Sequence, residues 1–191
     1  ISNDLSLELL CIGGESLTAS LVTEIQSFLP DVQINNHYGP TEITVDAIVA
    51  TDIKEFTNNN IGSPMPNVEA YIVDAFDNPV PLGVFGELYI GGKGVTKGYI
   101  NRETLTSEKF ISNPFKEGDR IYKTGDLARW LPDGTIEYIA RKDNQVKIRG
   151  YRIELGEIEN ALSLLESISQ CCVLAKADSI GSKRLVAYVV T

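Results

Sequence analysis

The sequence predicts an α/β plus β fold, in which a sheet-and-helix segment is followed by a β-rich segment and then by the start of a small α+β domain. Three observations predict this order. Apolar runs flank a helix-like repeat within the first 40 residues. From about Ile43 onward, short β-type segments alternate with Gly, Pro, Asn and Asp turns. Near Asp143 a basic segment leads into a second helix pattern, so we predict two domains, residues 1–142 and 143–191.

The first elements form a βαβ-like pattern. The run from Leu7 to Gly14 is typical of a buried strand that ends in a tight turn. Thr18 is placed to cap a helix whose apolar residues recur three and four positions apart, until Pro30 ends it. The run from Val32 to Asn35 predicts a second strand. Because ligands in open α/β sheets bind at the carboxyl ends of strands, the segment NNHYGPTE that follows is a candidate site.

Further runs predict the remaining elements. TVDAIVA, VEAYIVD, FGELYIGG and TIEYIAR predict strands of an antiparallel sheet or small barrel, and RETLTSEKF predicts a short helix. GELYIGGKGVTKGY is rich in glycine but has the spacing of neither common phosphate loop, so its glycines predict turns and bulges. In the second domain, ELGEIENALSLL predicts a helix, and CCVLAKA and RLVAYVV predict two strands.

Composition limits the class of protein. A chain of 191 residues with 43% hydrophobic content can bury a core, and its net charge of −9 argues against a broad nucleic-acid surface. No apolar run approaches the roughly 18 residues that cross a bilayer, so we predict a cytoplasmic protein with no membrane partner. Cys11, Cys171 and Cys172 fit no disulfide or metal pattern and are predicted to be buried. Because the chain begins at Ile1 and ends in an apolar run, we expect it to be a fragment.

The segment NNHYGPTE is suited to hold a metal-bound phosphate. Gly39 and Pro40 fix a sharp turn, which presents Tyr38 on one side and the Thr41 hydroxyl and Glu42 carboxylate on the other. Mg²⁺ usually takes one or two carboxylates together with substrate oxygens. The alternative is a loop in which these side chains cap a helix or a turn.

Asp126 is a second candidate because it follows Thr124 and Gly125, where backbone can approach a ligand closely. An aspartate can accept hydrogen bonds from both hydroxyls of a ribose. The alternative is a turn aspartate that caps its own backbone.

A basic segment, Tyr138 to Arg152, has a net positive charge within a chain whose net charge is negative. It suits a ligand that carries phosphate. The alternative is a strand pair whose charges meet acids of the next helix, Glu154, Glu157 and Glu159. The basic residues are Arg141, Lys142, Lys147, Arg149 and Arg152.

Five segments in this order resemble the motifs of the adenylate-forming enzymes, and most closely the amino-acid adenylation domain of nonribosomal peptide synthetases. They are GGES, NNHYGPTE, GELYIGGKGVTKGYINRETLTSEKF, YKTGDLARWLPDG and IARKDNQVKIRGYRIELGEIE. The similarity covers nearly the whole chain. It implies that residues 1–142 are the C-terminal part of the large adenylation core, with a sheet-and-helix layer and a small β-barrel. It also implies that residues 143–191 begin the small C-terminal domain.

The resemblance implies a set of residues around one nucleotide. The adenine contacts are matched by Gly14, Glu15, Ser16, Asn36 and the stacking ring of Tyr38, which precedes Gly39. The ribose ligand is matched by Asp126, and further nucleotide contacts by Tyr138 and Arg141. The catalytic contacts to phosphate are matched by Thr41, Glu42 and Arg141, of which Glu42 is also the Mg²⁺ ligand.

The resemblance also implies a substrate pocket and a hinge. The pocket for the amino-acid side chain is matched by Cys11, Gly13, His37, Val45 and Asp46. Because a buried carboxylate needs a partner, Asp46 favours a polar or cationic substrate such as Arg, Lys or ornithine. The alternative is that a backbone amide or His37 satisfies Asp46. Asp143 matches the hinge about which the small domain rotates between two half-reactions.

The implied chemistry is attack of an amino-acid carboxylate on the α-phosphate of ATP, followed by transfer to the phosphopantetheine thiol of a carrier protein domain. The segment from Lys147 to Arg152 matches the region that faces the pantetheine. A neighbouring condensation domain and an MbtH-like protein are further implied partners.

Three functional elements of the resembled family match no part of these 191 residues. They are its phosphate loop, its amine-binding aspartate and its catalytic lysine, so we expect this piece alone to be inactive. Two alternatives stay open, namely an acyl-CoA synthetase or luciferase-like ligase, and a non-catalytic module that interacts with a carrier.

Overall fold

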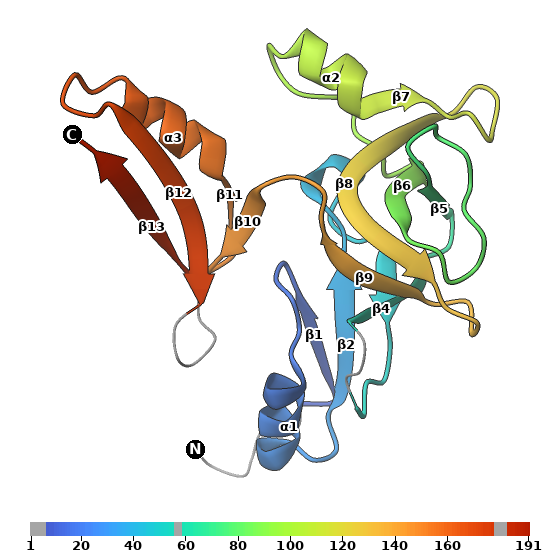
Figure 1. The fold of residues 1–191 in the computed structure, drawn as a ribbon. Coiled ribbons are helices and arrows are strands. Elements are labelled where there is room, and N and C mark those ends of the chain that lie inside the picture. Colours follow the sequence, from blue (N-terminus) through green and yellow to red (C-terminus); the bar gives the residue numbers. More distant parts are fainter. Residues whose placement is uncertain (1–6, 56–58, 178–182) are drawn as a thin grey trace. The chain divides into compact units, whose positions relative to one another are not determined.

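The computed structural model of the protein describes residues 7–55, 59–177 and 183–191, and the chain divides into two compact units, residues 1–142 and 143–191 (Figure 1). The elements of the first unit are β1 (Leu9–Gly13), α1 (Ala19–Phe28), β2 (Gln33–Tyr38), the 3-10 turn η1 (Thr41–Ile43), β3 (Ile48–Ala50), β4 (Asn60–Pro64), β5 (Val68–Val73), β6 (Gly86–Gly92), α2 (Glu103–Lys109), β7 (Phe110–Ser112), β8 (Arg120–Trp130) and β9 (Ile136–Arg141).

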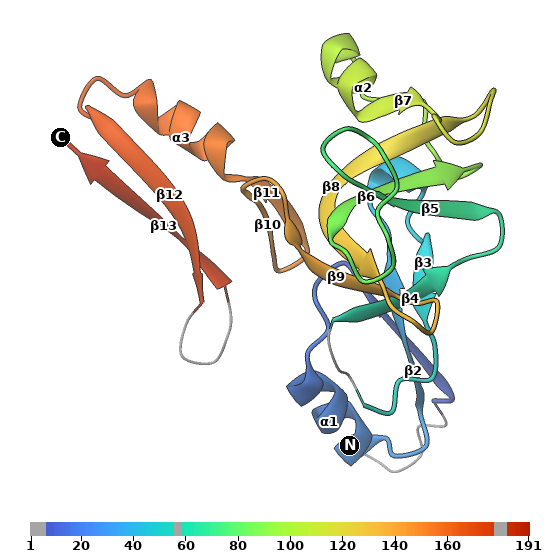
Figure 2. The ribbon, with the colours of Figure 1, turned by 45° about the vertical axis from the view of Figure 1, so that its right-hand side comes forward.

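The strands of the first unit form one nine-stranded sheet in the order β1-β2-β3-β4-β9-β8-β6-β5, with β7 paired to β8. Strands β1 and β2 are parallel, and the other neighbouring pairs are antiparallel. The predicted fold class is confirmed, and its α/β and antiparallel segments share a single sheet. The long strand β8 is curved, so the antiparallel strands surround one interior (Figure 1, Figure 2). Among the described strands, the hydrogen-bonded path ends at β1 and β5, which leaves the barrel open.

Helix α1 covers one face of the sheet beside β1 and β2. The Thr18 hydroxyl accepts a hydrogen bond from the Leu21 amide, as predicted for the helix cap, and the Leu29 amide donates to the Ile25 carbonyl at the other end. Val22 of the helix packs against Ile34 of β2 and against further apolar residues, Leu17, Val32 and Ile53.

The prediction that β1 is a buried strand is wrong. Leu10 and Ile12 pack against the cluster below α1, but Leu9 is 46% exposed and Cys11 is exposed as well. Strand β1 is at one edge of the sheet, and α1 covers one of its faces. Because side chains alternate along a strand, every second side chain of β1 points away from that helix. The predicted burial of Cys11 fails for the same reason.

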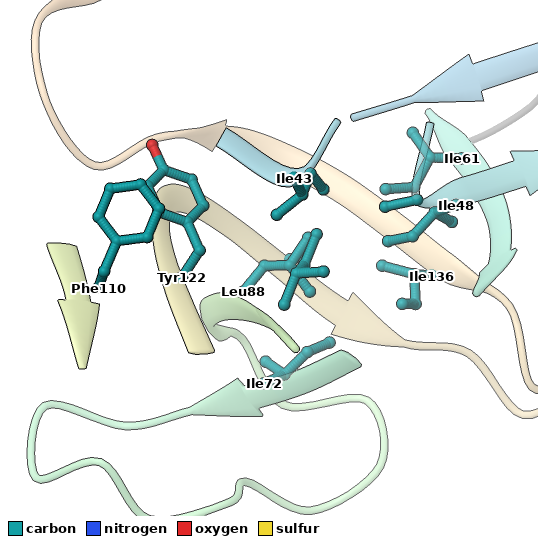
Figure 3. Packing of buried hydrophobic residues seen from close by; sticks show 11 residues of the cluster. Ile43, Ile48, Ile61, Ile72, Leu88, Phe110, Tyr122 and Ile136 are labelled. Atoms are coloured by element: carbon teal, nitrogen blue, oxygen red, sulfur yellow. The ribbon is translucent and has the colours of Figure 1, made fainter. Parts of the chain in front are cut away.

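The main core lies inside the curved antiparallel strands. Figure 3 shows its apolar side chains, with Phe110 and Tyr122 next to each other. Ile43 belongs both to this core and to η1, and burying an isoleucine side chain contributes about 1.5–3 kcal/mol. Ile43, the residue after Glu42, therefore fixes this turn to the core. The other labelled residues are Ile48, Ile61, Ile72, Leu88 and Ile136.

The second unit contains the hairpin β10 (Gln145–Ile148) and β11 (Tyr151–Glu154), helix α3 (Leu155–Ser163), and the hairpin β12 (Gln170–Ala177) and β13 (Lys183–Val190). Glu159 of α3 joins the helix to β12, because its side chain accepts the Val173 amide at 2.7 Å and its carbonyl accepts the Cys171 thiol at 3.3 Å. Cys171 is only half-buried and Cys172, on the opposite face of β12, is exposed, so their predicted burial is also wrong. No helix within the described ranges is long and apolar enough to cross a membrane.

Candidate functional site

The segment NNHYGPTE forms the end of β2 and the tight turn after it. Gly39 is required by packing, since a Cβ atom there would lie 1.9 Å from the Val45 carbonyl oxygen. The Ala47 amide donates to the Tyr38 carbonyl at 3.0 Å, so residues 45–47 fold back against the end of β2. Thr44 and Val45 have φ values of 61° and 75°, a conformation that costs side-chain-bearing residues about 1–3 kcal/mol each. The turn is thus held in a strained backbone geometry.

Tyr38, Asp126 and Arg141 come from three separate sequence segments, and their side chains meet. The Tyr38 hydroxyl donates to Oδ2 of Asp126, and Nη1 of Arg141 lies 3.1 Å from its Oδ1. Arg141 also donates to the Thr124 carbonyl at 2.8 Å. Asp126 and Arg141 are opposite each other in the β8–β9 pair, which explains why their side chains meet.

The Tyr38–Asp126 contact is partly buried, and it joins a neutral hydroxyl to a charged carboxylate. Asp126 is 6% exposed. Burial, followed by the negative charge of Asp126, raises the pKa of Tyr38 well above its ordinary value of 10.0, so the hydroxyl stays protonated and donates. The alternative of a self-capping turn aspartate is wrong, because Asp126 lies within β8. The ring of Tyr138 lies beside that of Tyr38, with centroids 6.5 Å apart.

Glu42, in η1, lies near Tyr122, which is on the same strand, β8, as Asp126. Its Oε1 accepts a hydrogen bond from the Tyr99 hydroxyl at 2.7 Å, and that hydroxyl is 3.4 Å from the Tyr122 hydroxyl. Tyr122 precedes Asp126 by four residues on β8, which corresponds to about 13 Å of extended strand. Glu42 is buried, whereas Thr41 beside it is exposed. The segment from Tyr38 to Glu42 therefore lies beside β8, with Tyr38 at Asp126 and Glu42 near Tyr122.

The acidic residues fit a magnesium ion only when a phosphate is bound with it. Within the described residues, no group of three or more His, Cys, Asp or Glu side chains could hold a metal ion. Glu42 supplies one carboxylate and Thr41 one hydroxyl, and Mg²⁺ is commonly bound by one or two carboxylates together with substrate phosphates. The side chains present fit that arrangement and not a cage built by the protein alone.

The predicted pocket residues lie on β1, on β2 and after η1. Gly13 pairs with His37 across the parallel strands, and a Cβ at Gly13 would lie 2.8 Å from the His37 carbonyl oxygen. Nδ1 of His37 is 3.1 Å from Oδ2 of Asp46. The alternative that His37 is the partner of Asp46 is thus the arrangement found. Val45 is 66% exposed, and Cys11 is exposed two residues before Gly13.

The predicted adenine-contact residues lie within or directly after the same two strands. Asn36 is buried within β2. The turn Gly14–Ser16 comes directly after β1 and is exposed, and the φ of 88° at Gly14 favours glycine. Because β1 and β2 are parallel, this turn and Tyr38 are at the same edge of the sheet.

The remaining predicted residues belong to the second unit. Asp143 is its first residue, and its side chain accepts the Gln145 amide at 3.1 Å. Lys147 is opposite Arg152 in the β10–β11 hairpin, although like charges at such positions repel. Lys147 and Arg149 are exposed, and neither forms an ion pair with another residue that the structure describes, so the alternative of pairing with the acids of the next helix fails for both.

Sequence reasoning missed Tyr99, Tyr122 and Thr124. The Thr124 hydroxyl accepts the Asp126 amide at 2.9 Å and donates to the Leu88 carbonyl at 2.7 Å, which fixes the strand around Asp126. The position of Thr124 in the TGD segment was an available signal. Tyr99 follows the glycine-rich stretch, but its partner Glu42 is 57 residues away in the sequence, so no local pattern could connect them.

Comparison with known proteins gives consistent matches. The family described as AMP-binding enzyme matches residues 2–100. Tyrocidine synthase 3 of Brevibacillus parabrevis is 50% identical over 186 residues, which are 97% of this chain and 3% of that protein. Gramicidin S synthase 2 of Brevibacillus brevis is 46% identical over 190 residues, covering 99% of this chain and 4% of that protein.

A solved structure matches as well. Holo-PA1221, an NRPS protein containing adenylation and PCP domains, has a TM-score of 0.88 at 28% identity, over 96% of this chain and 32% of that chain. The chain therefore spans about a third of this structure and only a few per cent of the two synthases.

Proposed function

Because this chain belongs to the family of AMP-binding enzymes, we propose that it is part of a domain that activates an amino acid with ATP for nonribosomal peptide synthesis. The observation that carries the proposal is the meeting of Tyr38, Asp126 and Arg141. The names of the two similar synthases support the peptide-synthetase branch over an acyl-CoA synthetase or a luciferase-like ligase.

In this proposal Asp126 accepts hydrogen bonds from the ribose hydroxyls of ATP or AMP. Tyr38 and Arg141 already donate to its two oxygens, but each oxygen has a second lone pair and the two donors fix the carboxylate's orientation. Bonds to a charged group contribute roughly 1.5–3 kcal/mol each. The ring of Tyr38 stacks on the base beside Tyr138, and the adenine is contacted by Gly14, Glu15, Ser16 and Asn36.

The turn after β2 is proposed to bind the phosphates. Gly39 lets the chain turn tightly enough for Thr41 and Glu42 to lie together at the strand end. Glu42 and Thr41 would hold Mg²⁺ together with the phosphates, and Arg141 would add a positive charge near the ribose and phosphate. When bound, Mg²⁺ supplies charge stabilisation for the phosphates.

The proposed first reaction is attack of the amino-acid carboxylate on the α-phosphate, which forms aminoacyl-AMP and releases pyrophosphate. The residues of this chain contribute position and charge rather than a covalent intermediate. Its buried Asp126 and Glu42 are each held by a tyrosine hydroxyl, so little reorganisation is needed when the nucleotide binds.

The proposed side-chain pocket contains Cys11, Gly13, His37, Val45 and Asp46. Asp46 is about 40% exposed and pairs with His37, so its carboxylate is available to a polar or cationic substrate side chain while His37 holds it in place. In a panel of amino acids, Asp46→Ala should lose preference for such substrates. An unchanged order of preference would contradict this part of the proposal.

The second half-reaction is proposed to use the second unit. Rotation about Asp143 brings the cationic hairpin, with Lys147 and Arg149 exposed, to the phosphopantetheine of a carrier domain. The PCP domain in the name of the similar structure supports a carrier partner. A condensation domain, an MbtH-like protein and a cytoplasmic location complete the proposal.

Amino-acid-dependent exchange of pyrophosphate into ATP by the full-length protein tests this function. One amino acid of a panel should stimulate exchange, and Glu42→Gln should lower the rate by about 10- to 100-fold. Stimulation only by a fatty or aryl acid with coenzyme A would favour the ligase alternative. Absence of nucleotide binding would favour a non-catalytic module.

A further inference from the structure

We propose that the glycine-rich segment from Gly92 to Tyr99 is a clamp that positions the Glu42 carboxylate, with Tyr99 as the positioning residue. This segment lies between β6 and α2 and resembles a phosphate loop only in its glycine content. The inference rests on the proposed function, in which Glu42 is the Mg²⁺ ligand, and it assigns a role to a segment outside the proposed phosphate-binding turn.

The backbone of the clamp is bonded to the η1 turn from two sides. The Thr96 amide donates to the Glu42 carbonyl at 2.8 Å, and the Thr44 hydroxyl donates to the Gly94 carbonyl at 2.8 Å. A Cβ atom at Gly94 would lie 2.7 Å from the Ile43 carbonyl oxygen. Glycine at this position therefore allows the clamp to approach the turn closely enough to form both bonds.

The side chain of Tyr99 completes the clamp. Its hydroxyl donates to Oε1 of Glu42 at 2.7 Å, and its ring packs edge-on against Phe110, with centroids 5.3 Å apart. The Tyr99 amide donates to the Thr106 hydroxyl at 2.9 Å. A Cβ at Gly98 would lie 2.3 Å from the Thr106 side chain, so α2 also contacts the chain next to Tyr99. Tyr99 is fixed at its backbone, its ring and its hydroxyl.

A tyrosine is chemically suited to this position. Glu42 is buried, at 4% exposure, and a buried carboxylate is costly unless it is hydrogen-bonded. A lysine or arginine would neutralise the carboxylate and compete with a cation for it. A neutral hydroxyl instead holds one oxygen in place without neutralising the negative charge of Glu42.

The test compares Tyr99→Phe with Tyr89→Phe in the full-length protein. Tyr89 is the control, because it is another tyrosine of the same unit whose hydroxyl donates to a carboxylate, Oδ1 of Asp77, at 2.6 Å. Binding of a non-hydrolysable ATP analogue is measured by calorimetry with and without Mg²⁺. The Mg²⁺ concentration for half-maximal pyrophosphate exchange is measured in parallel.

We expect Tyr99→Phe to weaken analogue binding by about 2- to 10-fold with Mg²⁺, the equivalent of one hydrogen bond, and to leave binding without Mg²⁺ unchanged. The half-maximal Mg²⁺ concentration should rise by a similar factor, and Tyr89→Phe should change neither quantity. Equal weakening with and without Mg²⁺, or wild-type behaviour of Tyr99→Phe, would overturn the clamp alone. A wild-type protein that binds no nucleotide would overturn the proposed function together with it.

Discussion

At the scale of residues, Asp126 is the side chain that joins Tyr38 and Arg141 in the candidate site. It has a Tyr38 hydroxyl on one oxygen and the Arg141 guanidinium on the other, and all three groups are at least partly buried. Removing one of these three side chains leaves a buried polar group without its hydrogen-bond partner, which costs free energy of folding. Structure and proposed function therefore depend on the same three residues.

Arg141→Gln should destabilise the first unit. The guanidinium donates both to Asp126 and to the Thr124 carbonyl, and its side chain is 20% exposed, so solvent screens the loss only in part. We expect a loss of about 1.5–3 kcal/mol, the range for hydrogen bonds to charged groups. Thermal unfolding of the protein measures it, and a melting temperature equal to that of wild type would contradict the assigned contact.

Alkaline pH should destabilise the protein through Tyr38. Burial and the charge of Asp126 raise its pKa in the folded state, whereas an unfolded tyrosine ionises near 10. The stabilising contribution is therefore fully present below pH 10 and is lost as the pH rises above it, because only the unfolded state then releases the proton. Tyr38→Phe should flatten the decline in melting temperature above pH 10. An unchanged slope in Tyr38→Phe would contradict the raised pKa.

At the scale of elements, much of the first unit follows from sequence patterns. The Thr18-capped helix, the strands before and after it and the strands β5, β6 and β9 have local signals, since apolar residues alternate and turns carry Gly, Pro or Asp. Strand β4 was not predicted because it contains Gly62 and Pro64, which usually end strands. Gly62 is nonetheless needed, since a Cβ there would lie 1.9 Å from the Val49 carbonyl.

The contacts of the candidate site were predicted from the sequence less completely than the secondary structure. Resemblance to a family placed Tyr38, Asp126 and Arg141 around one ligand, and the structure brings these three together. The hydroxyl bond between Tyr38 and Asp126 and the Tyr99 contact of Glu42 were not predicted. Both join residues more than 50 positions apart, so they arise from the tertiary fold and not from any local pattern.

The turn after β2 gives a prediction at this scale. Gly39→Ala should destabilise the first unit by about 1–3 kcal/mol or more, because the added methyl group meets backbone that cannot move aside. The matched control is Gly83→Ala, where φ is 80° but no atom lies within 4 Å, so only conformational strain applies. Thermal unfolding compares the two. A smaller effect for Gly39→Ala than for Gly83→Ala would contradict the close approach.

At the scale of the whole molecule, the chain consists of two units with different proposed tasks. The first carries the residues that are proposed to bind the nucleotide, and the second begins at Asp143 and carries an exposed cationic hairpin. Lys147 and Arg149 of this hairpin are exposed and suit the proposed binding of an anionic group.

Lys147→Glu should therefore separate the two half-reactions. In the full-length protein we expect pyrophosphate exchange to stay within about 2-fold of wild type, while loading of the carrier thiol falls by about 10-fold through the lost attraction for phosphate. Radiolabelled amino acid on the carrier measures loading. Equal losses in both reactions would contradict the assignment of the hairpin to the second step.

Calorimetric titration of AMP into the full-length protein and its Asp126→Asn variant tests nucleotide binding at Asp126, since asparagine keeps the shape of the side chain and removes its charge. We expect the variant to bind AMP about 10-fold more weakly or worse, since at least one charge-assisted bond to the nucleotide is lost, and we expect Tyr89→Phe to bind AMP like wild type. Equal affinity of wild type and Asp126→Asn would contradict the claim that these segments meet around a nucleotide.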